Sequence, residues 1–203
     1  MALPRGRHNL SVGEVAADQQ RRMLAAMAGA LAEHGYARAT VDDVLKRAGV
    51  SRRTFYEQFD DKEDCLCAAY DDAERRFWAT ATAAAMPASD WPERVHAALG
   101  AVLSLVSLES ETARLFTLEA RAAGPAIAAR HSAAVDRVAA TLRAGNRRCA
   151  RARALPEGTE GTLVGNVAAL IGSYVLSGAT ELLPGLEPQL GEHLLTPYRE
   201  CVG

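Results

Sequence analysis

Alternation of apolar and polar residues with a period of two, the pattern of a half-buried strand, is nearly absent from this 203-residue sequence. Apolar residues instead recur at helical spacing, and alanine is abundant. Apolar residues make up 49% of the chain and charged residues 24%, which is ordinary for a globular protein and excludes global disorder. The sequence therefore predicts an all-α fold.

Cysteine is scarce, and the four that occur are Cys65, Cys67, Cys149 and Cys201. They form no CxxC pair and lack the spacing of a zinc site. Cys65 and Cys67 are two residues apart, so a helix would point them to different faces. We therefore expect reduced thiols, no metal site and no cofactor.

Signals for export or membrane insertion are missing as well. The first eleven residues, MALPRGRHNLS, contain no apolar core of a signal peptide. Residues 161–180 carry no charge over the length of a membrane span, but polar side chains such as Asn166, Ser173 and Tyr174 interrupt the run. We therefore expect a cytoplasmic protein in which this segment is a helix buried in a core or a subunit interface, with no membrane partner.

The sequence also lacks common catalytic motifs. It contains no GxSxG, HExxH, P-loop or GxGxxG pattern. These absences argue against several large classes of hydrolases, metalloproteases and nucleotide-binding enzymes. We therefore do not expect an enzyme.

Helix start and stop signals divide the chain into about nine helices. A first helix over 14–34 ends at Gly35, and Thr40 then opens a second helix over 41–48. After a glycine turn, Ser51 is a candidate N-cap for a short third helix over 52–58. Further helices are expected from an N-cap at Asp60 or Asp61 to Pro87 and from Asp90 past Val106. The remaining helices are expected over 110–122, over 125–150, over the uncharged segment that ends at about 181, and over 187–200. A division near residue 61 predicts domains over 1–61 and 62–203.

The second and third helices have the form of a helix-turn-helix unit. Such a unit places the N-terminal residues of its second helix in the DNA major groove. Arg52 and Arg53 could pair with guanine or phosphate, and Thr54 could reach a base edge. The Tyr56 hydroxyl could donate to a phosphate, and Lys62 adds a cation where the next helix begins.

A purely structural interpretation of these residues is also open. Arg53 and Glu57 are four residues apart and could pair on a solvated helix face, and Tyr56 could be a half-buried wedge. The glycine turn, the short helix and the apolar pair Val50 and Phe55, spaced as a hydrophobic staple, favour DNA contact.

Two spaced patterns carry a family resemblance. The first comprises Gly35-Tyr36, Thr40-Val41 and Val44; the second comprises Gly49-Val50-Ser51, Phe55-Tyr56, Phe59, Lys62-Glu63 and Leu66. Together they are highly specific, and residues 14–70 resemble the DNA-binding domain of the tetracycline-repressor (TetR) family. One departure is Asp60-Asp61, which replaces a usually uncharged pair and brings acid near the expected phosphate path unless Asp61 is a helix N-cap.

The resemblance implies a ligand-responsive transcriptional regulator of the bacterial cytoplasm, associated with the nucleoid. It implies a homodimeric repressor, paired through helices over about 157–181 and 187–200, that a small-molecule effector releases from a palindromic double-stranded DNA operator. The DNA contacts that it implies are Arg5, Arg7, Thr40, Arg52, Arg53, Thr54, Tyr56 and Lys62. Arg5 and Arg7 belong to a basic arm that could enter the minor groove or could be a merely cationic tail.

The resemblance also implies an effector pocket in the larger domain. The candidate lining residues are Phe77, Trp78, Trp91, Phe116, Glu119, His131, Asn166 and Tyr174. Each of them is also compatible with an ordinary core or surface position. The apolar, alanine-rich composition favours a lipophilic or aromatic effector.

Three alternatives remain at this point. The same fold could serve an activator, or a regulator that responds to thiol chemistry or a metal through Cys65 and Cys67, which follow the helix-turn-helix. An enzyme is the third alternative, which the missing motifs disfavour.

Overall fold

A computed structural model of the protein describes residues 11–119, 123–145 and 155–201. These residues form nine α-helices and three short π or 3₁₀ segments, with no strand among them, which confirms the all-α prediction. The elements are α1 (Val12–His34), α2 (Val41–Ala48), α3 (Arg52–Tyr56), α4 (Lys62–Ala85), α5 (Trp91–Leu108), α6 (Ser110–Arg114), η1 (Leu115–Glu119), α8 (Pro125–Gly145), α9 (Thr159–Ser177), η3 (Thr180–Leu186), α10 (Glu187–Leu195) and η4 (Thr196–Cys201).

The helix boundaries follow local capping chemistry. The Asp90 carboxylate accepts from the backbone N–H of Glu93 at 2.8 Å and begins α5. Gly35 ends α1 with a φ of 69°, a left-handed value that glycine adopts without a Cβ clash. Pro125 opens α8 at the first helical position, where its missing N–H costs nothing.

Several boundaries differ from the sequence expectations. The uncharged helix α9 ends at Ser177 rather than near residue 181, because Gly178 takes a left-handed conformation and its N–H returns to the last turn. A 3₁₀ segment, η3, then spans Thr180–Leu186 and includes Pro184. Helix α3 ends at Tyr56 instead of residue 58, and the helix expected over 110–122 is split into α6 and the π segment η1.

Two clusters of buried side chains hold the molecule together. The first joins α1, α2 and α3 to the beginning of α4, with Met27, Phe55 and Leu66 fully buried in it. Leu115 and Ile127 extend this cluster to η1 and α8. The second cluster packs α5, α9 and α10 around residues such as Leu103. The first cluster therefore crosses the domain division that the sequence predicts near residue 61.

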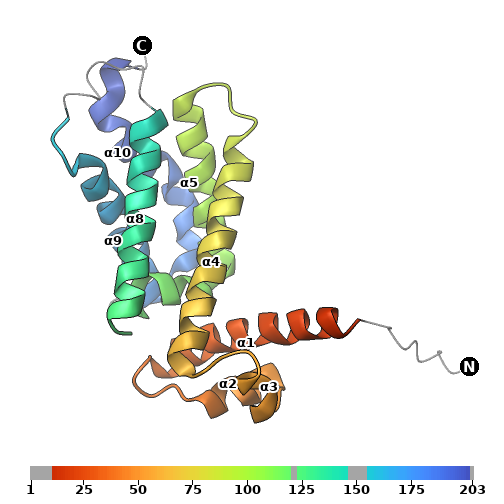
Figure 1. Cartoon of the computed structure of the whole chain (residues 1–203). Coiled ribbons are helices and arrows are strands. Elements are labelled where there is room, and N and C mark those ends of the chain that lie inside the picture. Colours follow the sequence, from red (N-terminus) through yellow and green to blue (C-terminus); the bar gives the residue numbers. More distant parts are fainter. Residues whose placement is uncertain (1–10, 120–122, 146–154, 202–203) are drawn as a thin grey trace, which may run out of the picture.

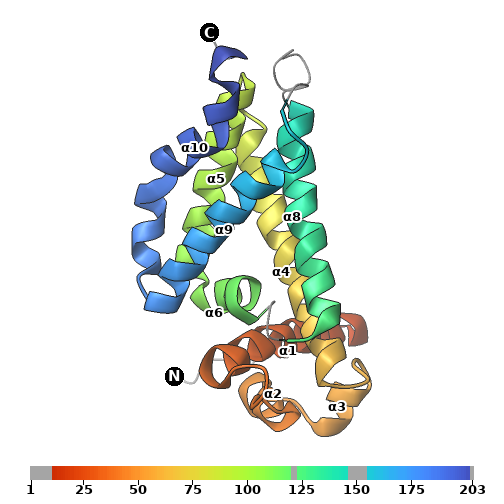
Figure 2. The same cartoon turned by 90° about the vertical axis from the view of Figure 1, so that its left-hand side faces the viewer.

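Helix α4 connects the two clusters. It begins beside α2 and α3 and runs upward along α5 and α8 (Figure 1). In the view turned by 90°, α6 lies directly above α1, and the two helices pack together (Figure 2). A shift of α4 would therefore move the helix-turn-helix, which shares a core cluster with the start of α4. Among the described helices, α9 included, none combines the length and apolarity of a membrane span.

Candidate nucleic-acid interface

The turn between α2 and α3 is fixed by its backbone. Gly49 has φ +64° and ψ 40°, and its N–H donates to the carbonyl of Leu45 at 3.0 Å. The N–H of Val50 donates to the same carbonyl at 3.3 Å. The guanidinium of Arg22, on α1, donates to the Ala48 carbonyl and caps the end of α2. These contacts set the angle at which α3 leaves α2.

The inner face of α3 is locked into the N-terminal core. The Ser51 hydroxyl accepts from the Thr54 N–H at 3.1 Å, so the helix begins where the sequence predicts. Phe55 is fully buried, and its ring centre lies 5.4 Å from that of Phe59. Because Phe55 and Phe59 pack inward, the opposite side of this five-residue helix faces outward.

The outer face of α3 carries the predicted DNA-contacting residues. Arg52, Arg53 and Tyr56 are exposed, with half of the Tyr56 surface accessible. Thr54 is half-buried, and its hydroxyl lies 2.9 Å from the hydroxyl of Ser51. Figure 1 places α2 and α3 at the end of the molecule opposite α10. An elongated partner could therefore approach this face without meeting the larger domain.

Both arginines of this face are already paired with carboxylates. Arg52 donates to Asp42 in the first turn of α2. Arg53 donates through Nε to Glu57 Oε1 at 2.8 Å, and this hydrogen bond raises the pKa of the Arg53 guanidinium. The pair of Arg53 with Glu57 is the one that the structural interpretation of the sequence describes. Because the Arg53 side chain is 88% exposed, the pair remains open to exchange with a phosphate.

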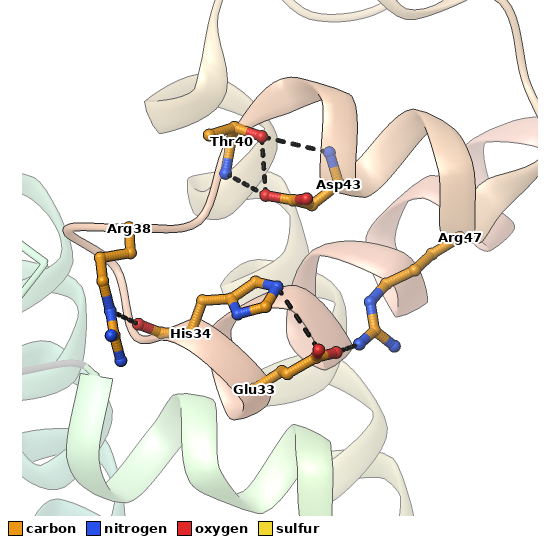
Figure 3. A network of polar contacts seen from close by, with 6 residues as sticks. All are labelled: Glu33, His34, Arg38, Thr40, Asp43 and Arg47. Atoms are coloured by element: carbon orange, nitrogen blue, oxygen red, sulfur yellow. Dashed lines mark hydrogen bonds and ion pairs between the residues drawn. The ribbon is translucent and has the colours of Figure 1, made fainter.

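Thr40 is the N-cap of α2 and belongs to a polar network between α1 and α2 (Figure 3). Its hydroxyl accepts from the Asp43 N–H, while the Asp43 carboxylate accepts from both the N–H and the hydroxyl of Thr40. These hydrogen bonds lower the pKa of Asp43. In the same network the guanidinium of Arg47 forms an ion pair with the carboxylate of Glu33. Thr40 thus sits at a helix N-terminus, with its hydroxyl engaged inside the protein.

Lys62 occupies a position that sequence reasoning did not anticipate. Its ammonium donates to the carbonyls of Tyr36 at 2.9 Å and Ala39 at 3.0 Å. The same nitrogen lies 4.2 Å above the centre of the Tyr36 ring, in a cation–π contact. Lys62 therefore ties the first turn of α4 to the loop that precedes Thr40, and two of its three N–H donors are occupied.

The two acids before Lys62, Asp60 and Asp61, take part in hydrogen bonds at the start of α4. Asp61 is the N-cap of α4 and accepts from the Asp64 N–H at 2.8 Å, which meets the condition under which this acid is tolerable. The Asp60 N–H donates to the Asp64 carboxylate at 3.1 Å. The negative charge of Asp61 therefore interacts with the positive N-terminal end of α4 and not with a phosphate.

Part of the predicted effector-binding set comes together in the larger domain. The rings of Phe77 and Phe116 meet edge to face at 5.1 Å. Tyr70, which the sequence analysis did not select for this set, stacks on Phe116 at 4.4 Å and joins its hydroxyl to Nδ1 of His131 at 3.3 Å. Tyr70 lies two helical turns before Phe77 on α4, so helical spacing could have found it.

The other members of that set are dispersed. Trp91 lies at the start of α5 against Tyr198, with ring centres 5.1 Å apart. Trp78 is half-buried near Arg137, and Tyr174 is half-buried against the second core cluster. Asn166 is exposed on α9, and the side chain of Glu119 lies outside the described part of the chain. The described side chains of this group therefore lie at separate places in the larger domain.

A cleft of about 460 Å³ lies elsewhere, between α1, α4 and the segment from the end of α5 to η1. Its walls are mostly alanine and leucine side chains, and its charged groups are paired. Arg76 donates to both oxygens of Glu109, at 2.7 and 2.6 Å, and to Asp72 at 3.1 Å. Arg21 pairs with Asp18. The cleft is a seam between helices that offers no unpaired charge among these residues.

The structure also bears on the hypothesis of a regulator that responds to thiol chemistry or a metal through Cys65 and Cys67. Cys65 and Cys67 are buried, and burial raises the pKa of the Cys65 thiol to about 12, which opposes thiolate chemistry. No group of three His, Cys, Asp or Glu side chains in the described ranges is placed to hold a metal. Burial therefore disfavours a regulator that responds to thiol chemistry through Cys65 and Cys67. Arg5 and Arg7, predicted to contact DNA, lie outside the described residues.

Comparisons with known proteins agree with this architecture. Residues 24–69 match the model of a family described as bacterial regulatory proteins, tetR family. No curated protein is detectably similar to the chain in sequence. Solved structures with 18–21% sequence identity are similar to the chain, and this similarity establishes its fold.

Three of these similar structures span nearly all of their own chains. The fatty acid degradation regulator FadR from Bacillus halodurans has a TM-score of 0.77 and 21% identity over 87% of this chain and 94% of its own. FadR from Bacillus subtilis, in complex with stearoyl-CoA, has a TM-score of 0.73 and 19% identity over 87% and 98%. A TetR-like transcriptional regulator from Rhodococcus sp. RHA1 has a TM-score of 0.70 and 18% identity over 100% of both chains.

Proposed function

We propose that this chain, a DNA-binding regulator that belongs to the tetR family of bacterial regulatory proteins, acts as a homodimeric repressor released from its operator by a small-molecule effector. The observation that carries the proposal is the outer face of α3. A short helix with one face locked in a core presents two arginines and a tyrosine at the end of the molecule. That arrangement suits insertion into a major groove.

The DNA-contacting residues divide by the reach of their side chains. Arg52, in the first turn of α3, is assigned to base reading, and Arg53 to a base or a phosphate. Thr54 is assigned to a base edge or methyl group, and the exposed hydroxyl of Tyr56 to a phosphate. The third N–H of Lys62, which has no hydrogen-bond acceptor among the described residues, serves a phosphate in the same assignment.

Two further contacts complete the proposed footprint. Thr40, at the N-terminus of α2, would approach phosphate through the backbone N–H groups of that helix end. Arg5 and Arg7 would reach the adjacent minor groove.

Dimerisation is assigned to the outward face of α9 together with α10. Leu170 and Leu176 are exposed on α9, and Leu182 is exposed in η3 just after it. Gly161 and Gly165 have open space where a Cβ would be, so a second helix could approach closely there. Exposed apolar side chains and small residues on the same helix are the composition of a helix-packing surface.

The mass of the protein in solution tests this assignment. Leu170→Arg should convert a dimer into monomers, because a charge would be buried without a partner. Leu108→Arg is the matched control, because Leu108 is 83% exposed on α5 and lies outside the assigned surface. Multi-angle light scattering that finds both variants dimeric would place the interface elsewhere.

The effector is assigned to the aromatic group formed by Tyr70, Phe77, Phe116 and His131. Three aromatic rings suit a lipophilic ligand, and one of the similar structures is FadR from Bacillus subtilis with stearoyl-CoA. Long-chain acyl-CoA is therefore the first ligand class to test. A ligand that prefers the conformation unable to bind DNA lowers DNA affinity by linkage.

The deciding experiment is a gel shift and footprint on DNA that flanks the gene for this protein, with a salt titration. We expect a protected inverted repeat whose half-sites lie about one helical turn apart, ~34–36 Å. Addition of palmitoyl-CoA, with free CoA as the control, then tests release. Weak, unphased and strongly salt-sensitive binding at every tested site would refute the repressor proposal. Lower expression of the flanking genes when this gene is deleted would indicate an activator.

A further inference from the structure

The pair formed by Arg52 and Asp42 differs from every other contact of the α3 outer face. Arg52 Nη2 donates to Asp42 Oδ1, and the two side chains come from the first turns of two different helices. Each side chain is more than half exposed. The pair of Arg53 and Glu57, in contrast, lies within one short stretch of chain around α3.

A carboxylate that holds an arginine changes what that arginine can read. A free arginine side chain samples many rotamers and can reach phosphates on either side of the groove. With one N–H anchored on Asp42, the planar guanidinium of Arg52 keeps its other donors in a defined direction. Guanine presents two acceptors, O6 and N7, in the major groove, which two such donors match.

The charge of the module makes this restriction consequential. Residues 1–61, the predicted DNA-binding domain, contain nine Lys/Arg and eight Asp/Glu, a formal net charge of +1. Sequence-independent affinity for DNA comes from neutralised phosphates, so a domain with so little net positive charge gains little from it. Discrimination between sites then depends on a few well-oriented side chains.

We propose that Asp42 is a specificity-determining positioning residue, which holds Arg52 in the orientation that reads one base pair of each half-site. The inference rests on the proposed function of α3 as the DNA-reading helix. Asp42 acts through Arg52 and also keeps it from phosphates. Removing the carboxylate therefore lowers selectivity at one position while raising affinity for unrelated DNA.

The experiment uses the full chain and an operator obtained by selection from randomised DNA. Competition binding against operators with each base pair substituted in turn gives a preference profile for the wild type, Asp42→Asn, Arg52→Ala and the double variant. We expect Asp42→Asn and Arg52→Ala to flatten the same position by about tenfold, as expected for one lost bidentate contact. The double variant should show no further flattening.

Two variants separate this role from simpler ones. Asp60→Asn removes an equal charge from the exposed segment before α4, and it should change affinity for all sequences together without altering the profile. Asp42→Glu keeps a carboxylate and should retain part of the preference that Asp42→Asn loses. A thermal melt of each variant checks that the helix-turn-helix is folded.

Three results would overturn the inference. Asp42→Asn could keep full preference at the position that depends on Arg52, or it could act like Asp60→Asn and shift all affinities together. Loss of preference in Asp42→Glu as complete as in Asp42→Asn would also contradict a positioning carboxylate. A wild-type protein that selects no sequence is a separate result, because it would refute the proposed function itself.

Discussion

Replacement of Lys62 by methionine tests how the helix-turn-helix is joined to α4. Methionine keeps most of the apolar stem and removes the ammonium, so the Tyr36 and Ala39 carbonyls lose their donors. Hydrogen bonds from a charged group contribute about 1.5 kcal/mol each at the low end. The cation–π contact with Tyr36 adds about 0.5–1 kcal/mol.

The total would be about 3.5–4 kcal/mol if the site were dry. Lys62 is only half-buried, so water replaces part of each contact and about 2 kcal/mol is the expected loss in the free energy of unfolding. For a chain of this length, that loss lowers Tm by about 4–8 °C. Lys46→Met is the matched control, because Lys46 is exposed on α2, and it should change stability by less than about 0.5 kcal/mol.

Differential scanning calorimetry and a salt titration of DNA binding read the two roles of Lys62 separately. The Tm from calorimetry measures how much the hydrogen bonds of Lys62 to the loop before Thr40 stabilise the fold. The slope of log affinity against log salt should fall by about one if the remaining N–H contacts a phosphate. An unchanged Tm for Lys62→Met would refute the structural reasoning. An unchanged slope would remove Lys62 from the proposed phosphate contacts.

The remaining predictions concern three positions. Tyr56→Phe should weaken binding to all DNA sequences by a similar factor and leave Tm unchanged; a change in base preference, measured by competition, would contradict a phosphate contact. Gly49→Ala should destabilise the protein by about 1 kcal/mol in chemical denaturation because φ is +64°, and no loss would mean that the turn relaxes. Glu160 is buried, and its pKa is lowered chiefly by the Arg143 hydrogen bond. Its stabilisation is therefore present above the unfolded carboxyl pKa of about 4.5 and is lost as pH falls through the lower folded value. Glu160→Gln should accordingly lower Tm at pH 7 by more than at pH 3, and an equal effect at both pH values would contradict this linkage.

Local features of the helix-turn-helix were predictable because they depend on residues close together in sequence. The capping box of Thr40 with Asp43, the left-handed Gly49 and the Ser51 N-cap each involve at most a few consecutive residues. The burial of Phe55 and Phe59 follows from helical spacing alone. The helix starts at Thr40 and Ser51 and the glycine turn between the two helices, which the sequence predicts, are confirmed, and they are sufficient to place α3 and its outer face.

Errors in the sequence analysis arose where several elements meet. Helix α9 was expected to reach residue 181, because nothing in its uncharged sequence distinguishes Gly178 from Gly172, which lies inside the helix. The role of the predicted effector-binding residues stays a prediction: they were chosen by type, and the structure brings Phe77, Phe116 and His131 into one neighbourhood. Which aromatic residues meet depends on how α4, η1 and α8 cross, and residue type carries no information on that.

The sequence by itself determined the helices, their caps and the outward face of α3, because backbone hydrogen bonding and apolar periodicity act over one or two turns. Only the tertiary structure decided the partners of the charged side chains. Lys62 turns to Tyr36 and Ala39 across 26 and 23 residues of chain, and Arg52 turns to Asp42 across ten. A long charged side chain pairs with whichever acceptor the packed helices bring within reach, and that acceptor is set by the fold as a whole.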